Sequence, residues 1–203
     1  RTIVPFGEIS ASIKNASVAI EDERFYQHSG IEPKAILRAV LVNLNLRKGY
    51  AGQGGSTITQ QVIKNALLSQ EKTVTRKIKE WILAMKLESI LDKEQILALY
   101  LNESPYGGNI YGVEEASMSF FGHHANELSL TESAYLAALP QSPTRYSPYG
   151  NHLDELEKRK DVVLKKMYDL GSITKDEYHT ALEEKVKFLP PQERGIRAPH
   201  FVM

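Results

Sequence analysis

Apolar residues recur at three- and four-residue spacing through most of this chain, a pattern typical of α-helices. One such stretch follows Pro33, a residue tolerated in a first helical turn, and runs over residues 36–44. Further helices are predicted over about 56–67, 73–91, 93–101, 129–140, 152–169 and 175–185. No convincing run of alternating polar and apolar residues indicates a strand. The sequence therefore predicts a mainly α fold.

Local signals set several helix ends. Ser129 with Glu132 and Thr174 with Glu177 have the spacing of capping boxes, and a break is expected near Asp92. Three segments between helices are rich in glycine, proline or tyrosine. We expect a mobile loop over 49–56, an ordered turn over 104–112 and a proline-rich loop over 141–150.

Length and charge restrict the class of protein. The 203 residues suit one large domain or two small lobes. Lysine plus arginine number 25, as do aspartate plus glutamate, so binding to nucleic acid through bulk charge is not expected. The chain has no cysteine, which excludes disulfides, thiolate catalysis and sulfur-ligated metals.

The two ends of the chain suggest a piece of a longer protein. The chain starts at Arg1 without an initiator methionine and ends in the apolar string APHFVM. No run approaches the roughly 18 apolar residues that span a bilayer. We expect that a membrane anchor upstream or a second domain downstream has been removed.

A first candidate site is EDERFYQHSG, residues 21–30. A carboxylate beside aromatic rings can be partly desolvated, which raises its pKa and makes it a better base near neutral pH. Glu21 and Asp22 lead this string, and Phe25 and His28 follow. The alternative is an acidic helix end packed on aromatic residues, with a structural histidine.

A second candidate site is GGSTITQQ, residues 54–61, where two glycines precede a helix rich in hydroxyl and amide side chains. Free N–H groups at a helix start bind oxyanions or phosphates. We expect the Gly55–Ser56–Thr57 amides to serve this purpose, with Lys64 one turn later. The alternative is a capped helix after a flexible loop.

A third candidate site is RKIKE, residues 76–80, on the predicted helix 73–91. Arg76, Lys77 and Glu80 lie at helical spacing and present two cations and a carboxylate on one side. These groups could clamp a diphosphate, or form only a surface ion-pair ladder. The apolar residues of the same helix, Ile78, Trp81, Ile82, Met85 and Ile90, face another way.

Two further strings are interpreted as packing elements. They are KEQILALYLNESPYGG, residues 93–108, and RKDVVL, residues 159–164. Tyr100 and Asn102 are expected to position other residues, and Arg159 to buttress the core.

These five strings, in this order, resemble the motifs of the glycosyltransferase domain of bacterial peptidoglycan polymerases. That family includes class A penicillin-binding proteins and monofunctional transglycosylases. The resemblance is close over residues 17–164, and we expect it to extend over the whole chain, 1–203. Lys160 departs from it, because the fifth motif often has a second arginine there. The resemblance implies a lysozyme-like fold with a large head lobe, a smaller jaw lobe and a cleft between them.

The resemblance also implies roles for individual residues. Glu21 would be the general base, and Glu80 a second carboxylate that holds Lys77 or a divalent ion. The residues implied to bind substrate are Ser56, Thr57, Gln60, Gln61, Lys64, Arg76 and Lys77. The residues implied to support the site are Asp22, Phe25, His28, Gly30, Tyr100, Asn102 and Arg159. No cofactor is required, although magnesium or manganese at the diphosphate is compatible.

The implied substrate is lipid II, a disaccharide-pentapeptide on a polyprenyl diphosphate, which is joined into β-1,4-linked glycan strands. The implied location is the outer face of a bacterial cell membrane, and moenomycin is the implied inhibitor. APHFV resembles the junction to a transpeptidase domain, and a transmembrane helix would precede Arg1. Residues 40–50 are expected to contact the membrane through Leu41, Val42, Leu44 and Leu46, with Arg47 and Lys48 at the phosphate layer; the alternative is that these leucines are core.

Two other functions stay open from the sequence. A lysozyme-like muramidase or lytic transglycosylase shares the helical cleft and the single key glutamate, but has no use for a diphosphate clamp. A catalytically silent protein that only binds lipid II or other proteins is the second alternative, and the presence of both Glu21 and Glu80 argues against it.

Overall fold

The computed structural model describes residues 2–33, 55–67 and 74–191. Within these ranges it is mainly helical, which confirms the predicted fold class. The helices are α1 (Ala11–Glu21), α3 (Ile58–Leu67), α4 (Val74–Glu88), α5 (Lys93–Glu103), α6 (Val113–Phe120), α7 (Leu130–Ala138), α8 (Leu153–Asp169) and α9 (Lys175–Glu183). The predicted helix over 36–44 and the expected membrane segment 40–50 lie outside the described residues, as does most of the loop 49–56.

Capping boxes set the starts of α5, α7 and α9. In each, the side chain of the N-cap residue accepts a hydrogen bond from the helix, and the side chain three residues later reaches back to the N-cap N–H. The pairs are Asp92 with Gln95, Ser129 with Glu132 and Thr174 with Glu177. The two predicted boxes are confirmed, and the first explains the break expected near Asp92.

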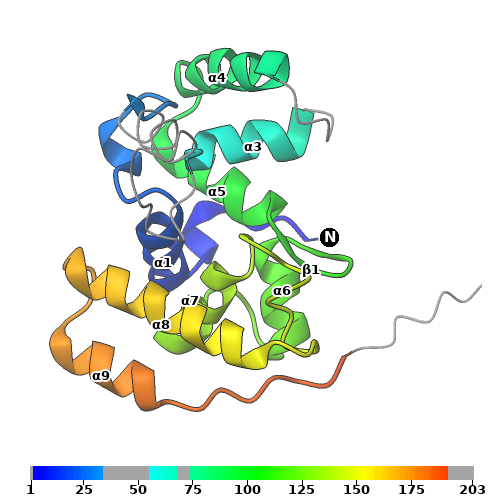
Figure 1. Ribbon diagram of the computed structural model, residues 1–203, viewed down its shortest axis with the longest axis vertical. Coiled ribbons are helices and arrows are strands. Elements are labelled where there is room, and N and C mark those ends of the chain that lie inside the picture. Colours follow the sequence, from blue (N-terminus) through cyan, green and yellow to red (C-terminus); the bar gives the residue numbers. More distant parts are fainter. Residues whose placement is uncertain (1, 34–54, 68–73, 192–203) are drawn as a thin grey trace, which may run out of the picture.

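The described helices form two groups (Figure 1). In the larger group α1, α7 and α8 pack on one another, with α9 against α7 and α8 and α6 against α7. In the smaller group α3 packs on both α4 and α5. α5 also contacts α6, so it connects the two groups. This division agrees with the expected head and jaw lobes, while the cleft between them stays a prediction.

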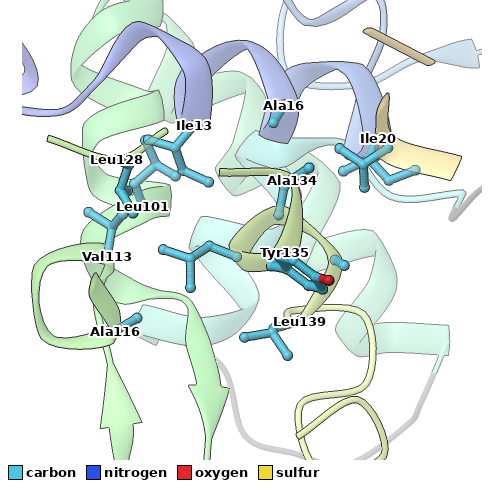
Figure 2. Packing of buried hydrophobic residues seen from close by; sticks show 14 of the residues in the cluster. Ile13, Ala16, Ile20, Leu101, Val113, Ala116, Leu128, Ala134, Tyr135 and Leu139 are labelled. Carbon is cyan, nitrogen blue, oxygen red and sulfur yellow. The ribbon is translucent and has the colours of Figure 1, made fainter. Parts of the chain in front are cut away.

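α1 lies in the core of the larger group and carries the first candidate site at its C-terminal end. Ile13, Ala16 and Ile20 are buried; Figure 2 shows Ala16 and Ile20 near Ala134 of α7 and Ile13 near Leu101 and Leu128. Burying a side chain the size of isoleucine contributes about 1.5–3 kcal/mol. Because Ile13, Ala16 and Ile20 all belong to the core, α1 is held along its length and the position of its C-terminal end is fixed.

Three short elements differ from the sequence prediction. α1 and α6 were not predicted, because both are short and neither begins with a capping box that marks its start. The ordered turn expected over 104–112 is a hairpin, in which β1 (Pro105–Gly107) pairs antiparallel with β2 (Ile110–Tyr111).

α4 turns its apolar face outward. Ile78, Ile82 and Met85 are 48%, 57% and 43% exposed. On the inner side Ala84 is fully buried and Glu80 is 1% exposed. A surface helix of a soluble protein usually buries its apolar stripe. In α4 the inner face instead carries the carboxylate of Glu80, and Ile78, Ile82 and Met85 form an apolar strip on the outer face.

Candidate active site

Glu21 is the last residue of α1 and is partly exposed. From α3, Gln61 donates a hydrogen bond from Nε2 to Oε2 of Glu21 over 2.7 Å. Burial of the carboxyl raises the pKa of Glu21, and the Gln61 hydrogen bond opposes that rise. The charges of Arg159 and Lys64 oppose it too. A carboxyl in this environment is suited to accept a proton.

Asp22 anchors the end of α1 to the start of α3. Its side chain is nearly buried and accepts the backbone N–H of Ile58 over 3.0 Å. It also lies 3.0 Å from Nε2 of His28. The N–H of Gly30 donates to Nδ1 of His28 over 3.2 Å, so Nδ1 is an acceptor and Nε2 bears the proton given to Asp22. Asp22 and His28 therefore support the site structurally.

The backbone at Gly30 lies against both α3 and α4. The hydroxyl of Thr57 donates to the carbonyl of Gly30 over 2.7 Å. Gly30 has a φ of +88°, and a Cβ there would lie 2.8 Å from the carbonyl of Ala84. Phe25, fully buried, packs its ring edge-on to His28. The four predicted supporting residues of the first string thus fix the chain around Glu21.

Thr57 caps α3, and its backbone amide takes part in that cap. The N–H of Thr57 donates to Oε1 of Gln60 over 3.2 Å, while the N–H of Gln60 donates to the hydroxyl of Thr57 over 3.2 Å. This reciprocal pair is a capping box. The next amide, at Ile58, is held by Asp22. The helix cap thus engages the Thr57 amide in this structure, and oxyanion binding by the Gly55–Ser56–Thr57 amides stays a prediction.

Lys77 brings the second and third strings together. Its Nζ donates to Oγ of Ser56 over 2.7 Å and lies 3.4 Å from Oε1 of Gln60. It also forms an ion pair with Glu80. The side chain of Lys77 is 32% exposed and that of Glu80 is 2% exposed. The buried carboxylate of Glu80 thus holds the ammonium of Lys77, as expected, while part of the Lys77 side chain stays exposed to solvent.

Adjacent residues of α3 connect Glu21 to Lys77. Gln61 holds Glu21, and Gln60 contacts Lys77. Glu21 and Glu80 are 59 positions apart in the sequence. The first turn of α3 nevertheless contacts both Glu21 and Lys77, the ion-pair partner of Glu80. Arg76 lies half-buried in the first turn of α4, beside Lys77 in sequence.

Arg159 belongs to the site more directly than the sequence suggested. It is 8% exposed, and its charge acts on Glu21, Tyr146 and Tyr100. Burial raises the pKa of Tyr100, and the nearby Glu21 raises it further. Tyr146, in the loop 141–150, was not predicted to lie near the site. Its position depends on how that loop packs, for which the local sequence gives no signal.

Lys64 and Asn102 occupy different surroundings. Lys64 is exposed on α3 and acts on Glu21 through its charge.

Asn102 is buried and forms two hydrogen bonds with the backbone of Val4. Its Nδ2 donates to the carbonyl of Val4 over 2.9 Å, and its Oδ1 accepts the N–H of Val4 over 3.0 Å. Asn102 therefore anchors the N-terminal segment, which confirms the expectation that it positions other residues.

The donor set around Lys77 does not resemble a metal site. Its carboxylate, Glu80, is paired with the ammonium. Among residues 2–33, 55–67 and 74–191, no group of three or more histidine and acidic side chains could hold a metal ion. Magnesium is usually held by one or two carboxylates together with substrate phosphates. A divalent ion at the diphosphate therefore stays a prediction.

Comparisons with known proteins give a consistent result. The family model for transglycosylases matches residues 1–168. Penicillin-binding protein 1A of Aquifex aeolicus is 47% identical over 184 residues, 91% of this chain and 25% of that protein. Penicillin-binding protein 1A/1B of Bacillus subtilis is 43% identical over 188 residues, 92% of this chain and 20% of that protein.

A solved structure supports the fold independently. The structure of penicillin-binding protein 1A from Haemophilus influenzae aligns with a TM-score of 0.56 at 24% identity. The alignment covers 95% of this chain and 19% of that protein. The chain thus spans about a quarter or less of the length of these three relatives.

Proposed function

The chain belongs to the transglycosylase family, and from this premise we propose that it polymerises lipid II into β-1,4-linked glycan strands. The observation that carries the proposal is the arrangement around α3. A partly buried carboxyl, Glu21, contacts Gln61 of this helix, and a partly open ammonium, Lys77, contacts the adjacent Gln60. A proton acceptor and a cation are the two groups that sugar transfer from a diphosphate needs.

In the proposed reaction Glu21 removes the proton from the 4-hydroxyl of the acceptor sugar. That oxygen forms a bond to the anomeric carbon of the growing chain as the bond from this carbon to the diphosphate oxygen breaks. Attack from the face opposite the diphosphate inverts the anomeric centre. Glu21 must be ionised to accept the proton, and Gln61, Lys64 and Arg159 favour that form against the effect of burial.

Lys77 meets the charge that develops on the leaving diphosphate. Glu80 and Gln60 hold its ammonium in place before the substrate arrives, so little reorganisation accompanies the reaction. Ser56, which accepts a hydrogen bond from Lys77, lies on the same side. Lys64 and Arg76 supply further positive charge. No step requires a metal ion, and moenomycin would compete as an anionic analogue of the donor.

The outward apolar strip of α4 supports a position at a membrane surface. The polyprenyl tail must stay in lipid while its head group reacts, and Ile78, Ile82 and Met85 offer apolar surface on the helix that carries Lys77. Among the described residues, no helix has the length and apolar character to cross a bilayer. We place this surface against the outer leaflet of a bacterial cell membrane, with a transpeptidase domain following in the parent chain.

Labelled lipid II in detergent tests the proposal. The chain should produce polymer, and Glu21→Gln should lower turnover at least about 100-fold while binding of lipid II persists. The matched control is Glu23→Gln, an exposed carboxylate two residues away that pairs with Lys166. Release of sugar fragments from purified glycan strands, without polymer from lipid II, would instead favour a lysozyme-like hydrolase.

A further inference from the structure

The ammonium of Lys93, the first residue of α5, lies where three parts of the protein meet. Nζ donates to the backbone carbonyl of His28 over 2.7 Å and to the carboxylate of Glu88 over 2.7 Å. It also lies 4.4 Å from the ring centre of Phe25. These contacts join α5 to the last residue of α4 and to the loop that follows α1.

Glu88 extends this cluster to α3, because the hydroxyl of Thr59 donates to its Oε1 over 2.6 Å. The side chain of Glu88 is 6% exposed and that of Lys93 is 22% exposed. Removing one member of such a pair leaves the other charge uncompensated in a poorly hydrated place. We call Thr59, Glu88, Lys93 and the carbonyl of His28 the α5 clamp.

The α5 clamp leads to both halves of the candidate site. On one side the ring of His28 holds Asp22, the residue next to Glu21. On the other side α4, which ends at Glu88, carries Lys77 about three helical turns earlier. The ammonium of Lys93 therefore holds both the loop that follows Glu21 and α4, the helix that carries Lys77.

We propose that Lys93 is a positioning residue for the glycosyl transfer and acts through His28 and Glu88. It sets the spacing between the carboxyl of Glu21 and the ammonium of Lys77. This inference rests on the proposed function. The ammonium of Lys93 is engaged with protein groups, so its role needs no contact with the substrate.

Lys93→Met is expected to lower kcat for lipid II polymerisation at least about tenfold. A misplacement of reacting groups by about 1 Å can cost about 100-fold in rate. KM should stay within about threefold, because the cations that bind the diphosphate remain on α4. A kcat within about threefold of the unchanged chain would overturn the proposal.

Two variants separate positioning from stability. Lys160→Met removes another lysine with a nearly buried side chain, paired with Glu157 and Asp161 away from the clamp, and should lower the unfolding midpoint without a loss of kcat. Lys93→Met combined with Glu88→Gln removes both charges and should recover most of the midpoint, because no unpaired charge remains. Its kcat should stay low, and recovery of kcat together with the midpoint would show a merely structural role. If Lys93→Met alone does not fold, the double variant carries the kinetic test.

Amide hydrogen exchange tests the positioning without any substrate. The N–H of Gly30 is bonded to the ring of His28, and its exchange should quicken at least about tenfold in Lys93→Met but not in Lys160→Met. Unchanged exchange at Gly30 would overturn the positioning role. Failure of the unchanged chain to polymerise lipid II would instead overturn the proposed function, and the exchange result would still decide the role of Lys93.

Discussion

Gln61 holds the carboxylate of Glu21 through a hydrogen bond of 2.7 Å, and it does so from α3 rather than from the helix that carries the glutamate. The preceding residue, Gln60, contacts Lys77 of α4. The start of α3 therefore contacts both the carboxylate of Glu21 and the ammonium of Lys77. Changes on this helix should affect protonation of the base and placement of the cation separately, depending on which glutamine is altered.

Gln61→Met should shift the acid limb of the pH profile of kcat/KM to higher pH. The hydrogen bond from Gln61 lowers the pKa of Glu21, so its loss lets that pKa rise further. A larger share of the base is then protonated in mildly acidic buffer, and turnover falls there more than in alkaline buffer. Polymerisation rates across the pH range would measure the shift, and a limb that moves toward lower pH would contradict the assignment.

Glu21→Gln should stabilise the fold near neutral pH although it removes activity. Because the pKa of Glu21 is raised in the folded state, its ionisation opposes folding once the pH passes that pKa. Below the unfolded-state value of about 4.3 the penalty is absent. The unfolding midpoint of the variant should be higher at neutral pH, by about 2–4 °C for each kcal/mol relieved, and the gain should vanish in acid. A lower midpoint at neutral pH would be evidence against the raised pKa.

Lys77→Met and Glu80→Gln should each slow polymerisation at least about tenfold, and the two losses should not add. Glu80 acts by holding Lys77, so removing Lys77 leaves Glu80 with little left to contribute. We expect a coupling energy of about 1–3 kcal/mol in the double-mutant cycle. Lys86→Met, an exposed lysine of the same helix, is the control and should retain activity. Full additivity would mean that the two side chains act independently.

Gly30→Ala should destabilise the fold by about 2–4 kcal/mol. The residue has a φ of +88°, and the added Cβ would meet the Ala84 carbonyl of α4 at 2.8 Å. Gly171→Ala is the matched control, because Gly171 has a φ of +71° with nothing within 4 Å of the added Cβ. That variant should cost only about 1–2 kcal/mol of backbone strain. Denaturant unfolding of both variants measures the loss of free energy of unfolding. Equal losses in the two would contradict a clash between the added Cβ and Ala84.

Sequence reasoning succeeded where the signal is local. The capping boxes at Ser129 and Thr174 and the ion pair of Lys77 with Glu80 depend on residues three positions apart, and each is present. The resemblance to a known family supplied the roles given to Glu21 and Lys77. Those residue roles stay predictions until the variants above are measured.

The sequence was less informative where tertiary packing decides. The spacing of Ile78, Ile82 and Met85 is that of a buried stripe, yet these side chains face outward because α3 packs on the opposite face of α4. The pattern alone also could not show that Gln60 uses the amide of Thr57, since a free helix start and a capped one have the same composition. The role of Lys93 gave no local signal, because its partners lie on two other segments, the loop after α1 and the end of α4.

The side chain of Gln60 closes the first turn of α3 and also touches the ammonium of Lys77. One carbonyl oxygen thus serves both a helix terminus and the lysine of the candidate site. Fraying of that terminus on warming would separate the ammonium from Gln60 and leave Glu80 as its ion-pair partner. Heat inactivation should then precede global melting and follow the opening of a single helical turn.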